Sequence, residues 1–575
     1  MQNSLIFIKK YWLVILGTLV VGLFTALPSL VFFQRIGDNW RGVYPVFNGD
    51  ALFYQARIRE IYDGHGAINH AYFFEHKNDV YPQQVGAEYF AYGLTKILGI
   101  SAPAAQLGWD FAAPALIFLL TYLFFKKFTA NEYTAVFFPA SLYTAVMGGL
   151  FKPIHPQVTL PLLLLFLFFW SKLILSAQKK WRNSLAAGLI LGLLFLTYFY
   201  HWSFLLVVIG IYLLIVLFEK AFGEIKYHAL MLGVAVVIGL PYFLKAWASL
   251  EAPGQAETMA RLGLYFSHLP ESYPRLAVAL VWLAFFAWFA RHYKIEKEKP
   301  AQIITALLGA NVLYPNHQII TGMILNNAAH WSWMPILIFS ASAHYMVGIL
   351  RRENMKLWKN RLMLLAVAML LILPAWRLST FFWHSYPEQY KNNIADDQQY
   401  YAGVFSWINA NTKPDDVILS DMQLMSFIPV YTAANVYNSY YAFVLPASDQ
   451  EIIERALLAH FFEPDFFTAK EFGYKGGDRI LWSLTADAEA NTHSVAGIWA
   501  IPYEPRYSLE AEKQAIRKIY DNLLKNDWDM SLLKKYRLDY IIWDKAEHPE
   551  WNVAKDNELE LAKQIGDILI YRVKS

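Results

Sequence analysis

The organisation of the chain follows from a polar stretch near its N-terminus, NGDALFYQARIREIYDGHG, at residues 48–66. It comes shortly after an uncharged apolar run, Tyr11 to Phe33, whose 23 residues are enough to cross the ~30 Å hydrocarbon core of a membrane. Within the stretch, Leu52 to Tyr62 has the apolar spacing of an amphipathic helix, which Gly64 ends. Asp50 therefore lies at the expected N-terminus of a short helix just outside a membrane span.

The composition indicates a polytopic membrane protein with a soluble part. Of its 575 residues, 56% are hydrophobic and 17% are charged, whereas an ordinary soluble protein has about 25% charged residues. The net charge of +3 gives no basic surface for nucleic acid, so no nucleic-acid partner is expected. The chain has no cysteine, which excludes disulfides, cysteine-ligated zinc and thiol nucleophiles.

Hydropathy predicts a polytopic α-helical membrane protein of about eleven spans. They are expected near residues 11–33, 103–125, 132–150, 156–175, 184–200, 202–218, 227–246, 274–290, 301–314, 331–349 and 362–382. With the N-terminus in the cytoplasm, the connections on that side carry most of the lysine and arginine, as the positive-inside rule requires. The odd number of spans then places the C-terminal part outside the cytoplasm.

Two parts are expected from this pattern. Residues 1–382 form the transmembrane part, with a first outer loop at 34–102 that carries Asp50 and a second, interfacial helix near 84–98. Residues 383–575 form a soluble extracytoplasmic domain of α/β or α+β type, long enough for a core of its own. Buried strands are predicted at 416–420, 540–543 and 568–571, and helices at 451–462 and 509–524. No phosphate-binding glycine loop or hydrolase motif occurs in this domain.

The spacing of Asp50, Tyr54, Arg57, Ile61 and Gly64 resembles the first outer loop of membrane glycosyltransferases of the GT-C superfamily. It is most similar to the catalytic subunits of oligosaccharyltransferases, and the protein O-mannosyltransferases and aminoarabinose transferases share the general plan. The resemblance implies a sugar donor carried on polyprenyl phosphate. It also implies that Asp50 is the catalytic carboxylate, with Tyr54 and Arg57 near the substrate. The alternative for Asp50 is a helix N-cap, since aspartate is preferred at that position.

Two features of the oligosaccharyltransferases are missing from this sequence. The second outer loop, FKPIHP at residues 151–156, contains no acidic residue, and Trp-Trp-Asp occurs nowhere in the chain. Their absence argues against protein N-glycosylation and weakens the case for a divalent metal (Mg²⁺ or Mn²⁺), so no metal ligand is assigned. Lys152 and His155 stand where the second acid would be and are candidates for contacting a phosphate; the alternative is a polar turn between two spans.

Further polar residues near the outer ends of spans are candidates for substrate contact. Asp110 lies inside the second span, where an ionisable residue is costly and usually functional. His317 and His330 belong to a polar, aromatic hairpin between apolar segments. Such a backbone is tolerated at this depth only where it lines a cavity or is buried in protein. The alternatives are a side chain that reaches the interface for Asp110 and an ordinary interfacial loop for the hairpin.

Two arginines are candidates for binding the phosphate of a lipid donor. Arg261 lies in the outer loop at residues 247–273, and Arg377 lies near the outer end of the last expected span. The planar guanidinium group suits phosphate because it donates two parallel hydrogen bonds. The alternative for each is an arginine that snorkels to the membrane interface.

The sequence thus predicts an integral membrane hexosyl- or pentosyltransferase of GT-C type. It would move a sugar from a polyprenyl-phosphate donor to a glycan, lipid or protein acceptor at the outer face, in contact with membrane lipids. Two other classes remain open. A transporter or flippase of lipid-linked saccharides would have polar residues in both leaflets and repeat symmetry. A non-catalytic assembly or scaffold protein with an outer binding domain would keep its activity when Asp50 is replaced by asparagine.

Overall fold

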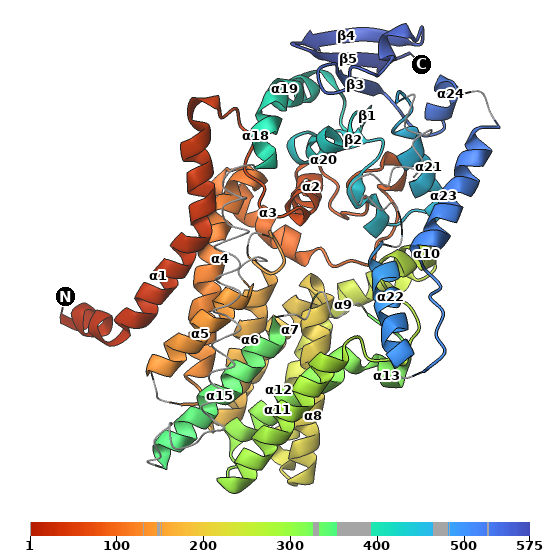
Figure 1. The fold of residues 1–575 in the computed structure, drawn as a ribbon. Helices are drawn as coiled ribbons and strands as arrows, with labels where there is room; N and C mark the ends of the chain where they lie inside the picture. The colour runs from red at the N-terminus through yellow and green to blue at the C-terminus, as the bar shows by residue number, and fades with distance from the viewer. Residues whose placement is uncertain are drawn as a thin grey trace.

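The structure is a computed structural model in which long helices form a bundle and a β-sheet with its own helices lies at one end of that bundle (Figure 1). It describes residues 2–129, 132–146, 150, 152–325, 330, 333–353, 393–463, 481, 483–498, 500–525 and 528–574. The expected last span at 362–382, and Arg377 with it, lie outside the described residues.

The bundle has a helix at each of the other ten expected spans. They are α1 (Gln2–Ile36), α4 (Ala102–Phe125), α5 (Glu132–Val146), α6 (Thr159–Leu175), α7 (Lys180–Thr197), α8 (Phe199–Phe218), α9 (Ile225–Ser249), α11 (Tyr273–His292), α12 (Lys299–Leu313) and α15 (Met334–Arg352). Six of the described helices, namely α1, α4, α8, α9, α11 and α15, are long and apolar enough to cross a membrane. The count of about eleven spans and their orientation stay predictions.

Small residues set the distance between bundle helices. A Cβ atom added to Gly188 of α7 would lie 2.6 Å from the carbonyl oxygen of Met231 in α9. One added to Gly192 would lie 2.6 Å from the Cβ atom of Ile238. Only glycine therefore allows these two backbones to approach so closely, which is how helices in membranes gain packing contacts.

The first outer loop lies between the bundle and the sheet (Figure 1). Its helical segments are η1 (Gly37–Asn39), α2 (Asp50–Tyr62), η2 (Phe74–His76) and α3 (Gly86–Leu98). The helix α2 begins two residues before the sequence prediction, and α3 agrees with the prediction to within two residues. Phe90, Ile97 and Leu98 of α3 expose their apolar side chains. Four short elements lie in the connections between later bundle helices. They are η4 (Phe222–Glu224), α10 (Gln255–Arg261), η5 (Tyr314–Asn316) and α13 (Gln318–Thr321).

Residues 393–574 contain a five-stranded mixed sheet of order β2-β1-β3-β5-β4. The strands are β1 (Val417–Leu419), β2 (Asn435–Val436), β3 (Tyr540–Asp544), β4 (Leu559–Ile565) and β5 (Ile568–Val573). The strand β1 is parallel to both β2 and β3, whereas β3–β5 and β5–β4 are antiparallel. The helices are α18 (Ile394–Gln398), α19 (Ala402–Asn411), α20 (Met422–Tyr431), α21 (Asp449–Leu458), α22 (Ser483–Ile498), α23 (Leu509–Leu523) and α24 (Met530–Leu533), with 3₁₀ turns η8 (Gln399–Tyr401), η9 (Tyr440–Val444) and η11 (Val553–Lys555).

The sheet region does not build its core alone, which corrects the expectation of an independent core. Leu52 and Tyr72 of the first outer loop belong to the same buried cluster as Ile418 and Ile541 of the sheet. The amide of Val436 in β2 donates a hydrogen bond of 3.1 Å to the carbonyl of Tyr72. The strands β1 and β2 are too short to bury much apolar area by themselves, so the first outer loop completes the core.

Candidate active site

Asp50 is the first residue of α2, and its side chain does not cap the helix. The N-cap is Gly49, and the amide of Asp50 donates to the Oδ1 atom of Asn48 at 3.0 Å. The carboxylate of Asp50 forms an ion pair with the ammonium group of Lys152, and 51% of the Asp50 side chain stays exposed. The capping alternative is therefore wrong, and the carboxylate faces a cation and an open side of the molecule.

Lys152 reaches Asp50 from the connection between α5 and α6. Its Nζ atom also lies 5.6 Å from the centroid of the Tyr54 ring, one turn further along α2. Burial alone lowers the pKa of Lys152, but Tyr54 and Asp50 outweigh burial and raise the pKa above its usual value. Burial also raises the pKa of Tyr54. The site thus combines a cationic lysine, a neutral phenol and an accessible carboxylate.

The same connection carries His155, which lies among aromatic side chains of the bundle. The His155 ring stacks on the Tyr198 ring with centroids 3.5 Å apart, and the Tyr198 hydroxyl is 2.7 Å from Nδ1 of His330. Burial is the main cause that lowers the pKa of His155 well below its usual value and the pKa of His330 to about 3. These imidazoles are neutral at neutral pH, so the positive charge of the site is on Lys152, and a phosphate contact by His155 stays a prediction.

Asp110 is buried in α4 and bonded to protein groups. Its Oδ1 atom accepts hydrogen bonds from Gln106 at 2.7 Å and Gln157 at 2.8 Å, and its Oδ2 atom accepts one from Ser29 at 3.3 Å. Gln157 also donates to the carbonyl of Leu150 at 2.6 Å. The structure gives Asp110 a positioning role, since this network fixes the connection that carries Lys152 and His155.

Arg57 does not face the site. Its Nε atom donates to Glu88 of α3 at 2.6 Å, its Nη2 atom donates to the carbonyl of Gln84 at 3.2 Å, and the side chain is 1% exposed. The expected substrate contact is thus replaced by a buried ion pair that fastens α2 to α3.

Arg261 is likewise structural. Its guanidinium group donates to five oxygen atoms, on Thr258, Phe443, Leu445, Ala447 and Asp449. An arginine has five N–H donors, so these bonds leave little for a lipid phosphate. The physical reason is tertiary: the side chain is fully buried where α10 meets η9 and the start of α21.

His317 is not in contact with the other candidates that the structure describes. Its Nδ1 atom lies 3.1 Å from the Thr321 hydroxyl in the next turn, and burial lowers its pKa. Its ring neighbour among the described residues is Tyr314, 6.3 Å away between centroids. The structure therefore brings together Asp50, Tyr54, Lys152, His155 and His330, and leaves His317 apart.

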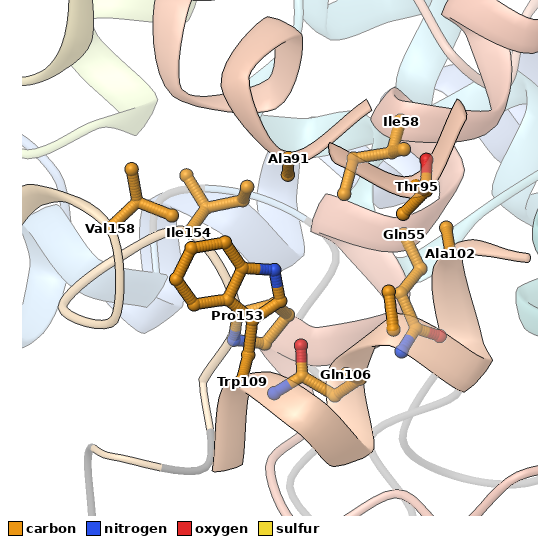
Figure 2. Close-up of a pocket in the computed structure, with 11 residues that line it drawn as sticks. Gln55, Ile58, Ala91, Thr95, Ala102, Gln106, Trp109, Pro153, Ile154 and Val158 are labelled. Carbon is orange, nitrogen blue, oxygen red and sulfur yellow. The ribbon is translucent and has the colours of Figure 1, made fainter. Parts of the chain in front are cut away.

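A small cavity lies beside the connection between α5 and α6 that carries Lys152. Figure 2 shows Trp109 of α4 beside Pro153 and Ile154, with Gln55 of α2 and Thr95 of α3 across the cavity. Ile154 has a φ of +65°, a conformation that a β-branched residue adopts only under strain. The connection that follows Lys152 is thus held in a demanding conformation, and its Pro153 and Ile154 line the cavity.

Two side chains near the site were not predicted from the sequence. Tyr441 of η9 donates its hydroxyl hydrogen to the carbonyl of Gly49, which places the C-terminal part directly beside Asp50. His201 lies in the first turn of α8 with its ring 5.4 Å from His155. A histidine inside a long uncharged run was the one available signal for His201. Among the described residues, no group of three or more His, Asp or Glu side chains could hold a metal.

Comparisons with known proteins give structural similarity without sequence matches. A scan against protein-family models finds no match, and a search of curated proteins finds none either. The chain is similar to the crystal structure of ArnT from Cupriavidus metallidurans bound to undecaprenyl phosphate, with 12% identity, a TM-score of 0.41, and 96% of this chain and 97% of that chain covered. It is also similar to the apo oligosaccharyltransferase of Archaeoglobus fulgidus, with 12% identity, a TM-score of 0.43, and coverage of 93% and 70%.

A third solved structure is the Archaeoglobus fulgidus oligosaccharyltransferase AglB in complex with an inhibitory peptide and a dolichol-phosphate. Its identity is 13%, its TM-score 0.36, and the coverage is 94% of this chain and 70% of that chain. Because the TM-scores lie below 0.5, the reaction has to be inferred from the site itself.

Proposed function

We propose that this protein is a glycosyltransferase that moves a sugar from a polyprenyl-phosphate donor to an acceptor hydroxyl at the outer membrane face. The observation that carries the proposal is the ion pair of Asp50 and Lys152, which lies where the bundle meets the sheet region and leaves the carboxylate half-exposed. The displacement requires a base for the acceptor proton and a cation for the leaving phosphate, and this pair supplies both groups once substrates take the place of the mutual contact.

In the proposed reaction the acceptor oxygen attacks the anomeric carbon of the donor sugar. Asp50 takes the acceptor proton as the new C–O bond forms, and the bond from the anomeric carbon to the phosphate oxygen breaks. The lipid phosphate leaves with the bonding electrons, and the ammonium group of Lys152 stabilises its charge. One displacement inverts the anomeric configuration. Tyr54, with its neutral phenol under Lys152, keeps the lysine directed toward the reaction centre.

The proposal also includes the orientation of the protein, with the site at the outer membrane face, and the class of acceptor. Tyr441 contacts the turn before Asp50, which supports a role for the C-terminal part in selecting the acceptor. Glycans, lipids and proteins all offer hydroxyl groups and all fit the reaction described.

The test uses purified full-length protein with donors built on undecaprenyl phosphate and dolichol phosphate, each carrying different neutral sugars. We expect release of lipid phosphate together with an acceptor product of inverted anomeric configuration. The Asp50→Asn variant should bind donor and release almost none. Wild-type protein that moves the intact donor between leaflets without breaking it would instead favour a flippase. Equal release by the wild type and Asp50→Asn would refute the mechanism.

A further inference from the structure

Three histidines beside the Asp50–Lys152 pair, two of them buried and His330 half-buried, have ring nitrogens that the proposed reaction does not use. His155 precedes α6, His201 lies in the first turn of α8, and His330 lies between α13 and α15. The ring centroid of His155 is 5.4 Å from that of His201 and 6.4 Å from that of His330. The charges of Lys152 and Asp50 both act on His330, so this histidine cluster adjoins the reacting pair.

Each histidine in the cluster has its Nδ1 atom next to a protein oxygen. Thr159 at the start of α6 serves two of them, with its hydroxyl 2.6 Å from Nδ1 of His155 and its carbonyl oxygen 3.2 Å from Nδ1 of His201. The Tyr198 hydroxyl serves His330 at 2.7 Å. These contacts fix the ring orientations and direct the three Nε2 atoms away from their Nδ1 partners.

The tautomer of His201 follows from its partner. A carbonyl oxygen only accepts, so His201 donates from Nδ1, and the Nε2 atom of the neutral ring is an acceptor. That Nε2 atom is buried and has no hydrogen-bond partner among the residues the structure describes. A buried acceptor without a donor costs free energy, which a ligand with a hydrogen-bond donor would recover.

The chemistry around the cluster favours an uncharged, hydroxyl-rich ligand. His155 and His330 are neutral, so an ionised carboxylate would lose its hydration there and would find the neighbouring cation, Lys152, already paired with Asp50. A hydroxyl donates to an acceptor nitrogen and accepts from a donor nitrogen equally well. Two aromatic rings pack on the cluster and offer faces on which a sugar can stack: Tyr200 stacks on His330 at 4.1 Å, and Trp333 lies edge-on to His201 at 5.6 Å.

We infer that His155, His201 and His330 form the subsite for the donor's sugar ring, and that this sugar is uncharged with free hydroxyl groups. The inference rests on the proposed transfer reaction and narrows it. Lys152 faces the phosphate, and the histidine cluster faces the sugar hydroxyls. His201 is a binding residue in this arrangement and takes no part in the displacement.

Binding is the readout, so the subsite is tested whether or not turnover occurs. Three lipids are compared with full-length protein: polyprenyl-phosphate hexose, the same donor with its hydroxymethyl group oxidised to a uronic acid, and bare polyprenyl phosphate. We expect the wild type to bind the neutral donor about tenfold more tightly than bare lipid phosphate, a factor of the size that one satisfied buried hydrogen bond gives. The uronic-acid donor should show no such gain.

The His201→Phe variant keeps an aromatic ring and removes the acceptor nitrogen. It should lose the tenfold preference while binding bare polyprenyl phosphate as the wild type does. The matched control is His344→Phe in α15. His344 is also buried, has Nε2 3.0 Å from the carbonyl of Phe125, and has no partner for Nδ1 among the residues that the structure describes. This control should keep the preference.

Three results would overturn the subsite: a wild type that binds all three lipids equally, one that favours the uronic acid, or a His201→Phe variant that keeps the full preference. The first two need only the wild type, so they decide the matter even if His201→Phe does not fold. A tight, selective donor complex that never releases lipid phosphate would contradict the proposed reaction and leave the subsite standing.

Discussion

Two ion pairs made by side chains of α2 differ in how far they are exposed. At the N-terminus of α2, Asp50 pairs with Lys152, and 51% of the Asp50 side chain is exposed. Two turns further on, Arg57 pairs with Glu88, and the two side chains are 1% and 2% exposed. The first pair can exchange its partner for a substrate, whereas the second is closed on all sides. Sequence spacing placed Asp50 and Arg57 in one motif, but burial distinguishes the open pair of Asp50 from the closed pair of Arg57.

The strongest test of this contrast is the Asp50→Asn variant. Loss of a general base costs about 10²–10⁴-fold in rate, so lipid phosphate release should fall by that factor while donor binding is kept. The matched control is Asp63→Asn at the other end of α2, where the carboxylate pairs with Arg59 at 2.9 Å. We expect its rate to stay close to that of the wild type. A similar fall in both variants would mean that α2 needs its charges for folding rather than for chemistry.

Breaking the closed pair of Arg57 and Glu88 should lower the stability of the folded protein. Arg57→Met leaves the Glu88 carboxylate buried without its cation, which costs about 3–5 kcal/mol. Thermal unfolding in detergent should show a large loss for Arg57→Met and a partial recovery for the double variant Arg57→Met with Glu88→Leu. Arg59→Met, which breaks the half-exposed pair with Asp63, should cost less than about 1 kcal/mol. Equal losses at Arg57 and Arg59 would remove the distinction between the two kinds of pair.

Lys152, the cation of the open pair, allows a second test of the contrast between the open and the closed pair. Lys152→Met removes the cation proposed to meet the donor phosphate, and a hydrogen bond to a charged group contributes about 1.5–3 kcal/mol. The donor affinity should therefore fall about 10- to 100-fold, with Lys152→Arg restoring part of it. Thermal stability should change little, because Asp50 remains solvated without its partner. A Lys152→Met variant that binds donor normally would show that the phosphate lies elsewhere.

The fold could be predicted well where periodicity and length carry the information. The apolar runs correspond to bundle helices, the helix after Asp50 was expected at Leu52 and begins two residues earlier, and β3 was expected at 540–543 and spans Tyr540–Asp544. The strands β2 and β4 were not predicted. β2 has two residues, and β4 exposes most of its side chains at the sheet edge, so neither has the continuous apolar run of a buried strand.

The site could be predicted only in part, because sequence distance hides partners. Asp50 and Lys152 were candidates from their own loops, and the structure joins them. Arg261 was an equally suitable candidate for a phosphate from its sequence position. Its N–H groups, however, donate to Asp449 and to nearby carbonyls, which lie far from Arg261 in the sequence. In the sequence, an arginine near the end of a span looks the same whether its guanidinium group contacts a lipid phosphate or a buried carboxylate. Only the tertiary structure separates those cases.

A third ion pair, intermediate between the open and closed ones, gives the smallest predicted effect. His76 of η2 lies between Asp79, 2.5 Å from its Nδ1 atom, and Glu451 of α21, 2.8 Å from its Nε2 atom. Arg455 shares Glu451 with it and also pairs with Glu75. The histidine therefore fastens the first outer loop to the sheet region through a charge that can titrate.

The pH dependence of this contact follows from the direction of the shift. Burial lowers the pKa of His76, but its hydrogen bonds to Glu451 and Asp79 outweigh burial and raise the pKa above the usual value near 6.5. The protonated histidine thus stabilises the folded state fully below about pH 6.5, and this contribution is lost as the pH rises through the raised pKa. Because the pair is partly exposed, the loss should be less than about 1 kcal/mol. Thermal unfolding of the wild type and His76→Gln from pH 6 to pH 9 should converge as the pH rises. Parallel curves across that range would mean that protonation of His76 contributes nothing to the stability of this junction.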